Sequence, residues 1–177
     1  MGSKKLKAVV VRGDLKIEPK DRDAVVALNK ETVKWEKEGP VAPVYELFTN
    51  HGTGGSYESS IYAGDTSVKN WARSSLDLTE EQIRPVTSQE MDARYKKKKY
   101  ACNACSIGCG AIYSVGEGKW PLEETSRPEY ETQGMFGSQL LNASAEAVNK
   151  CNWLCNEYGF DTISMGGTIA WCMENYS

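Results

Sequence analysis

The stretch Ala101-Cys102-Asn103-Ala104-Cys105-Ser106-Ile107-Gly108-Cys109-Gly110 contains three of the six cysteines in this 177-residue chain. On a helix, the spacing Cys-x2-Cys-x3-Cys would place the three sulfurs along one stripe, close enough to share a metal centre. The two glycines let the backbone come close to whatever is bound. The stretch therefore predicts a metal centre whose ligands are Cys102, Cys105 and Cys109.

The kind of metal centre follows from the ligand spacing. An iron–sulfur cluster with three clustered ligands and one distant ligand fits best. Zinc ribbons pair two Cys-x2-Cys knuckles, and the sequence has no second knuckle, so zinc would need an unusual fourth ligand. The alternative without a metal is three small buried cysteines, because free cysteine packs as a hydrophobe. The other cysteines fall on apolar helical stripes, and we interpret them as core residues: Cys151, Cys155 and Cys172.

The composition limits the classes of function. A chain of this length with 40% apolar residues can form one domain with a hydrophobic core. The net charge of -3 provides no broad basic surface for nucleic acid. The sequence has no apolar run of about eighteen residues and no apolar stretch after a basic start, so we expect neither a membrane span nor a signal peptide. We expect a cytoplasmic protein, in which cysteines stay reduced and serve metals or redox chemistry.

The N-terminal part predicts one strand followed by helices. Residues 6–13 are rich in valine and end at a glycine, which is typical of a strand. The next fifty residues offer no partner strand, so we expect its sheet to lie in sequence outside this chain. Apolar residues at helical spacing predict an amphipathic helix over residues 20–38, which Gly39-Pro40 ends. A short helix over residues 43–48 would leave the only histidine, His51, as a solvated side chain in a glycine-rich loop.

Two capping boxes predict helices in the middle of the chain. Thr79-x-x-Gln82 and Thr87-x-x-Glu90 each satisfy free amide groups at a helix start. The second helix should run into the four lysines 96–99. These lysines can complement the helix dipole and stay solvated, or they can attract an acidic electron carrier to a nearby cluster.

The C-terminal part predicts a hairpin and two helices. Residues 111–115 and 119–122 flank Gly116-Glu117-Gly118 and read as two paired strands. Asn142 should cap a helix that ends at Gly159, and Asp161 should cap the next helix. The predicted fold is therefore mainly α, with one N-terminal strand and a β-hairpin after the cysteine motif.

Several stretches together resemble one protein family, the tungsten-pterin aldehyde ferredoxin oxidoreductases. They run in family order and span nearly the whole chain: residues 1–8, the Gly52-Thr53 turn, Lys69-Asn70-Trp71, the cysteine motif, residues 127–132 and residues 155–164.

The resemblance implies a fold, an activity and site residues. The fold would be the helical middle domain of the family. The enzyme would oxidise an aldehyde to a carboxylic acid at a tungsten (or molybdenum) bis-pterin, and pass electrons through a [4Fe-4S] cluster to ferredoxin or another iron–sulfur carrier. Cys102, Cys105 and Cys109 match three of the four cluster ligands. Tyr130 and Glu131 match the active-site pair beside the tungsten, and Asp161 matches a residue that contacts a pterin.

The resemblance also implies that the chain is one part of a larger enzyme. Residues 1–19 would be the final strand and linker of an N-terminal pterin-binding β domain, and residues 20–177 an incomplete helical domain that binds cluster and pterin. The fourth cluster cysteine would come from the remainder of the enzyme or from a partner subunit, and we expect an oligomer. Two alternatives stay open: a superfamily member with another substrate, such as a benzoyl-coenzyme A reductase catalytic subunit, and a non-catalytic iron–sulfur electron-transfer module.

Overall fold

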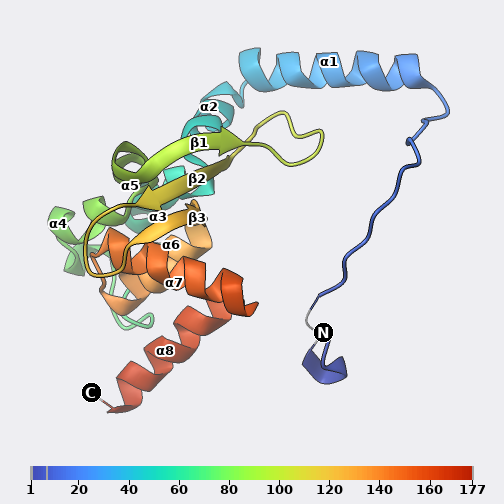
Figure 1. Ribbon diagram of the computed structural model, residues 1–177. Helices are drawn as coiled ribbons and strands as arrows, with labels where there is room; N and C mark the ends of the chain where they lie inside the picture. Colours follow the sequence, from blue (N-terminus) through green and yellow to red (C-terminus); the bar gives the residue numbers. More distant parts are fainter. Residues whose placement is uncertain (1, 7, 177) are drawn as a thin grey trace. The chain divides into compact units, whose positions relative to one another are not determined.

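The structure, a computed structural model, describes residues 2–6 and 8–176 (Figure 1). The chain divides into two compact units, Met1–Ala42 and Pro43–Ser177. Eight α-helices and three strands occur in the described part, so the mainly α prediction is confirmed. The helices are α1 Arg22–Glu38, α2 Ala42–His51, α3 Tyr57–Ala63, α4 Glu80–Ile83, α5 Ser88–Tyr95, α6 Tyr130–Phe136, α7 Ala145–Tyr158 and α8 Thr162–Tyr176. The strands are β1 Lys96–Tyr100, β2 Gly110–Val115 and β3 Leu122–Ser126.

In the first unit the predicted helix is confirmed and the predicted strand is not. Asp21 caps α1 by accepting a hydrogen bond from the Ala24 amide (2.9 Å), and α1 ends before Gly39 as expected. Residues 8–13 form no strand, and Lys7 lies outside the described residues. Val10 and Val11 are 92% and 87% exposed. Because no described strand lies beside them to pair their backbone groups, an extended run here cannot become a strand.

The second unit packs its helices around a three-stranded antiparallel sheet. The strand order is β1-β2-β3, so the predicted hairpin is confirmed, although its second strand begins at Leu122. Helix α5 contacts β1 and β2, and α7 contacts β3 (Figure 1). One core cluster joins helices α3, α4, α6 and α7 through Tyr57, Ile61, Ile83, Val86, Phe136, Val148 and Cys155. A second cluster joins α5, β2 and α7 through Met91, Ala111, Tyr113 and Ala145.

The lysine run is a strand, which corrects the prediction of a helix end. Helix α5 starts at its Thr87 cap and stops at Tyr95, and residues 96–100 then pair antiparallel with β2. The capping box predicted the helix start but carries no information about its end. Pairing with β2 supplies the backbone partners that a continuing helix would otherwise provide.

The two C-terminal helices are close to those predicted. Ser144, not Asn142, caps α7, because its hydroxyl accepts from the Ala147 amide at 3.2 Å. The Asn142 carboxamide oxygen instead accepts from the Ser144 amide at 3.0 Å. Gly159 ends α7 in the left-handed conformation (φ 71°). Cys155 is buried in the core and Cys151 packs against it, as predicted, while Cys172 is half-buried on α8.

Candidate functional site

The cysteine motif forms the loop that joins β1 to β2, and not a helix. Within it, the Cys105 amide donates to the Cys102 carbonyl at 3.1 Å, which closes a turn. Ala104 and Gly108 both have left-handed backbones, with φ of 57° and 60°. Two left-handed residues four positions apart are incompatible with a helical stripe, so the predicted helical geometry of the motif is wrong.

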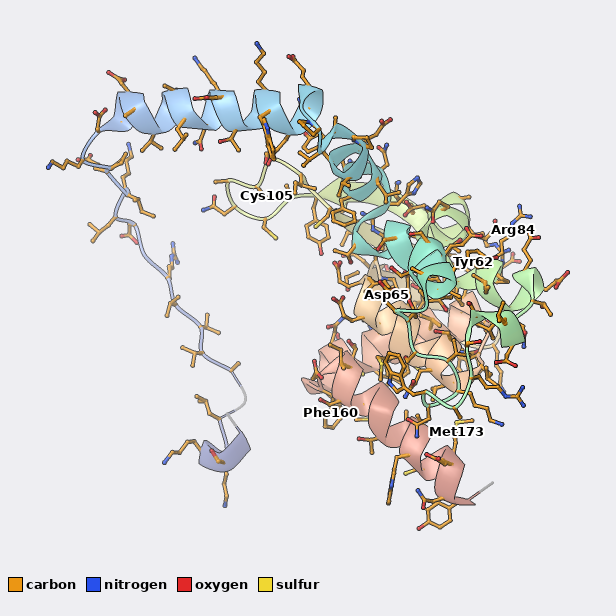
Figure 2. All side chains as sticks on the ribbon, turned by 180° about the vertical axis from the view of Figure 1, so that it is seen from behind. Tyr62, Asp65, Arg84, Cys105, Phe160 and Met173 are labelled. Atoms are coloured by element: carbon orange, nitrogen blue, oxygen red, sulfur yellow. The ribbon has the colours of Figure 1, made fainter. Side chains whose placement is uncertain are left out.

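The loop presents its thiols to solvent and carries a donor set that fits an iron–sulfur cluster. Cys102 and Cys105 are exposed, Cys109 is half-buried, and all three are free of disulfides. Figure 2 shows Cys105 on this loop. In the described part of the chain no three His, Cys, Asp or Glu side chains already converge as metal ligands. Three soft sulfur donors on one bent loop are nevertheless the ligand type that iron–sulfur clusters use.

A buried ion pair fixes the end of the cysteine loop. The Arg127 side chain is 3% exposed, and its Nη1 atom lies 3.0 Å and 3.1 Å from the two carboxylate oxygens of Asp92. The same nitrogen donates to the Asn50 carbonyl at 3.0 Å, and Nη2 donates to the Cys109 carbonyl. Arg127 therefore connects the last cysteine of the loop to α5 and to the end of α2.

Asp92 is the acceptor for four side chains. In addition to Arg127, Tyr113 Oη donates to it at 2.7 Å and Lys96 Nζ at 3.1 Å. His51 Nδ1 lies 2.9 Å from its Oδ2, and since an ionised carboxylate can only accept, the ring donates. His51 is the last residue of α2, so its prediction as a solvated loop side chain is wrong.

The pKa shifts in this network have opposite signs. Burial alone would raise the pKa of Asp92, but the Tyr113 hydrogen bond and the Arg127 charge, with the bonds from His51 and Lys96, bring the pKa below its ordinary value. Burial and the hydrogen bond to Asp92 raise the pKa of Tyr113, which stays a phenol. The network therefore holds one carboxylate, one guanidinium and a neutral phenol in fixed positions.

A glycine at the end of α2 makes this close approach possible. A Cβ atom on Gly52 would lie 2.9 Å from Arg127 Nε and 3.0 Å from the Cys109 carbonyl oxygen. Its φ of 67° is also a conformation that side chains disfavour. The Gly52-Thr53 turn, predicted only as a tight turn, thus shapes the space in which the cysteine loop is anchored.

A pocket of about 310 Å³ has Arg127 in its lining. Carboxylates, amides and hydroxyls dominate its lining: Tyr100, Ser126, Arg127, Glu129, Glu131, Thr132, Asn152, Asn156, Thr162 and Ile163. Asn152 Nδ2 donates to the Ser126 carbonyl at 2.9 Å, which holds α7 against β3 at the pocket wall. The candidate catalytic residue Glu131 is exposed and lines this pocket, so its carboxylate can contact a bound molecule.

Tyr130 points away from its neighbour Glu131. Its hydroxyl lies 2.9 Å from Thr66 Oγ1, and its amide donates to Thr53 Oγ1 at 2.9 Å. Thr53 in turn donates to the Glu129 carboxylate. The start of α6 is therefore held by the Gly52-Thr53 turn, and the two residues that resemble an active-site pair do not face the same group of side chains.

Asp161 and Cys109 do not line this pocket but are next to residues that do: Asp161 precedes Thr162, and the Cys109 carbonyl accepts from Arg127. Asp161 Oδ2 accepts from the Ser164 amide at 2.7 Å and caps α8, as predicted, and this hydrogen bond lowers its pKa. Burial raises the pKa of Cys109, and the negative charge of Glu129 raises it further. A cation or metal beside Cys109 would counteract both effects and favour its thiolate.

Two residues of the site escaped the sequence-based reasoning. The sequence indicates Arg127 only as part of the stretch that resembles the family, and it gives no sign of Asp92, because one carboxylate on a helix carries no signal by itself. The detectable hint was the tyrosine at position 113: a tyrosine on a buried strand face needs a partner for its hydroxyl.

Comparisons with known proteins identify the family. A model of "Aldehyde ferredoxin oxidoreductase, domains 2 & 3" matches residues 29–177. The chain belongs to the aldehyde ferredoxin oxidoreductase family. It is 33% identical over 176 residues to the tungsten-containing aldehyde ferredoxin oxidoreductase of Pyrococcus abyssi and 32% identical to that of Thermococcus kodakarensis. Both alignments cover 99% of this chain and 27% of the relative.

A more distant relative is named for a different activity. The chain is 27% identical over 178 residues to the "Aliphatic sulfonate oxidoreductase, WOR-like subunit" of Pyrococcus furiosus. The chain thus spans about a quarter of the length of these relatives, which are oxidoreductases. Within the described residues, no helix is long and apolar enough to cross a membrane.

The first prediction concerns the Asp92–Arg127 pair. In Asp92→Asn the buried guanidinium loses its counter-ion, which should cost about 3–5 kcal/mol of unfolding free energy. Because folding lowers the pKa of Asp92, its stabilisation is present above about pH 4 and is lost as the pH falls through the folded value. Urea denaturation between pH 3 and pH 7 should therefore show that the unfolding free energy of the wild type falls on acidification. The Asp92→Asn variant should lack this fall.

The control is Asp77→Asn, which removes the partner of Arg73 in an exposed ion pair (3.1 Å). Exposed pairs contribute little, so this variant should unfold close to the wild type at pH 7. An Asp92→Asn protein with wild-type stability and wild-type acid sensitivity would show that the pair does not hold the fold.

Proposed function

We propose that this chain is part of a tungsten-pterin enzyme that oxidises an aldehyde to a carboxylic acid and transfers the electrons through a [4Fe-4S] cluster to ferredoxin. Family membership supports the reaction class. The observation that carries the proposal is the position of Arg127, which binds the backbone of the cysteine loop and also lines the pocket that contains Glu131. A cluster on the loop would therefore lie beside the pocket where oxidation occurs.

Cys102, Cys105 and Cys109 would hold three irons of the cluster, and a fourth ligand would come from outside this chain. Arg127 fixes the backbone at Cys109, while the exposed part of the loop can adjust until the three thiolates face one cluster. The exposed thiols at Cys102 and Cys105 are accessible to a redox partner. The cluster would serve as the one-electron relay between the active site and the carrier.

Glu131 would act as the proton acceptor. Oxidation of an aldehyde with water to a carboxylic acid releases two electrons and two protons; a bound tungsten-pterin group supplies the two-electron step. Glu131 lines the pocket, where its carboxylate can accept one of these protons. Tyr130 would act from outside this lining, because its hydroxyl contacts Thr66; where Thr66 donates to the Tyr130 oxygen, the phenol hydrogen is free to bind a substrate oxygen.

Asp161 would bind the pterin at the start of α8. Its Oδ2 already accepts from the Ser164 amide, and a carboxylate has further lone pairs for pterin N–H donors. The neighbouring Thr162 binds Thr132 at 3.0 Å, which ties the start of α8 to α6 next to Glu131. We propose that cofactor contact and helix capping share this one carboxylate.

A second candidate is a family member with another substrate. The 27% identity to the aliphatic sulfonate oxidoreductase subunit supports it, because the alignment covers 99% of this chain and that relative is named for another substrate. The non-catalytic electron-transfer module, in contrast, would contain iron and sulfide without tungsten or molybdenum. Metal analysis of the full-length protein separates the module from both enzymes, and a substrate panel separates the enzymes. The oligomeric state and the cytoplasmic location stay predictions.

The second prediction tests the cluster ligands. Cys102→Ser, Cys105→Ser or Cys109→Ser in the full-length enzyme should each lose the intact cluster and ferredoxin-linked activity, because a hard hydroxyl replaces a soft thiolate. Cys172→Ser is the control, since this half-buried cysteine lies on α8 and should leave the cluster intact. Iron and sulfide analysis of the four variants decides the assignment. Full iron content in Cys105→Ser would disprove it.

The third prediction tests Glu131. Glu131→Gln should retain tungsten, pterin and iron but slow turnover by about 100-fold or more, which is typical of a lost general base. Glu124→Gln, an exposed carboxylate on β3, is the matched control. Steady-state rates with an aldehyde and an artificial acceptor are compared at equal metal content. Near-wild-type turnover of Glu131→Gln would remove this residue from the reaction.

A further inference from the structure

Three lysines on the strand that leads to the cysteine loop have no ionic partner in residues 2–6 and 8–176. Lys97, Lys98 and Lys99 are exposed and belong to no ion pair in that part of the chain. Lys96 differs, because its Nζ atom lies 3.1 Å from Asp92 Oδ2 and 3.2 Å from the Asn50 carbonyl oxygen. The run therefore consists of one structural lysine followed by three uncompensated charges, which we call the β1 lysines.

The position of the β1 lysines makes them accessible. β1 is an edge strand of the sheet, with β2 as its only neighbour in the described part. A bulge between Lys96 and Lys98 breaks the regular alternation of side chains, and the three lysines that follow Lys96 all reach solvent. All three charges are thus open to an approaching protein along this edge of the sheet.

Lysine on an edge strand has a simpler explanation, because it prevents strands of two molecules from pairing. Two observations go beyond that explanation. The chain has a net charge of -3 but places four of its 21 basic residues in consecutive positions. β1 also continues directly into the cysteine loop, as Figure 1 shows. The charge is therefore concentrated beside the proposed redox centre.

We propose that the β1 lysines are the docking surface for an acidic protein electron carrier. The proposal rests on the proposed function, because it requires a redox centre on the cysteine loop. Cys102 is the third residue after Lys99, so their α-carbons are at most about 11 Å apart. A carrier bound over β1 would therefore have its own redox centre close to the exposed Cys102 and Cys105.

The chemistry of the surface favours a small acidic protein over nucleic acid. Nucleic-acid sites need extended basic surfaces with many phosphate contacts, and here three free lysines are set in a chain of net negative charge. Electron carriers form small, transient interfaces in which clustered opposite charges raise the association rate. Such attraction weakens with ionic strength, because salt screens exposed charges beyond about 10 Å at 0.1 M.

The test is carried out on the full-length enzyme with the triple substitution K97Q/K98Q/K99Q, which removes the charges and keeps the side chains polar. Two probes are used, an acidic ferredoxin and a variant of the same ferredoxin whose acidic surface charge has been neutralised. The Kd of the enzyme for each probe is measured by titration at low ionic strength. The triple variant should bind the acidic ferredoxin about tenfold more weakly, with a flatter salt dependence. Turnover with a small uncharged acceptor should not change, since Lys96 and its contacts to Asp92 are retained.

The matched control is K30Q/K34Q/K37Q, which removes three exposed lysines from α1 and changes the net charge equally. It should bind the ferredoxin like the wild type. If both triple variants bind the ferredoxin equally weakly, the effect depends on net charge and not on the position of the lysines, which contradicts the proposal. Unchanged binding by K97Q/K98Q/K99Q would also overturn it. If that variant binds normally but aggregates, the β1 lysines only protect the edge. Ferredoxin binding without aldehyde oxidation would instead refute the proposed reaction and leave the docking surface in place.

Discussion

The buried pair of Asp92 and Arg127 is the interaction on which the rest of the site depends. Removing two charges from water has a high desolvation free energy. It is offset here because almost every polar atom of the pair has a hydrogen-bond or ionic partner. Arg127 reaches the carbonyls of Asn50 and Cys109, and Asp92 accepts from Tyr113, Lys96 and His51. The pair joins the end of α2, helix α5, the sheet and the cysteine loop at one point.

This arrangement separates the rigid and the adaptable parts of the cysteine loop. Cys109 is held through its backbone and is half-buried, whereas Cys102 and Cys105 are exposed on a turn. Cluster binding would therefore change the exposed part of the loop and leave its anchored end in place. Because Arg127 also lines the pocket with Glu131, the loop and the pocket share one fixed wall. A substitution in the ion pair should disturb both together.

Local signals predicted much of the fold. Gly159 and Asp161 mark helix ends by capping chemistry, which depends only on nearby backbone groups, and both predictions are confirmed. The residues that were predicted wrongly depend on distant partners. The lysines 96–99 form a strand only because β2 pairs with them, and residues 8–13 form none because no described strand does. Neither outcome is encoded in the segment itself.

The same division applies to the site. The cysteine spacing identified the candidate ligands, but it suggested a helix where the structure has a loop with two left-handed residues. Asp92 could not be found from the sequence, because its importance comes from four side chains that are distributed between positions 51 and 127. The polar partner that Tyr113 required was the one available hint.

The measurement that tests this account most directly is an anomalous diffraction experiment at the iron absorption edge on crystals of the full-length enzyme. The account predicts an iron peak enclosed by the sulfurs of Cys102, Cys105 and Cys109, with the Arg127 guanidinium still bound to the Cys109 carbonyl and to Asp92. An iron peak bound by other residues, or an Arg127 side chain that has left the Cys109 carbonyl in the loaded enzyme, would contradict it.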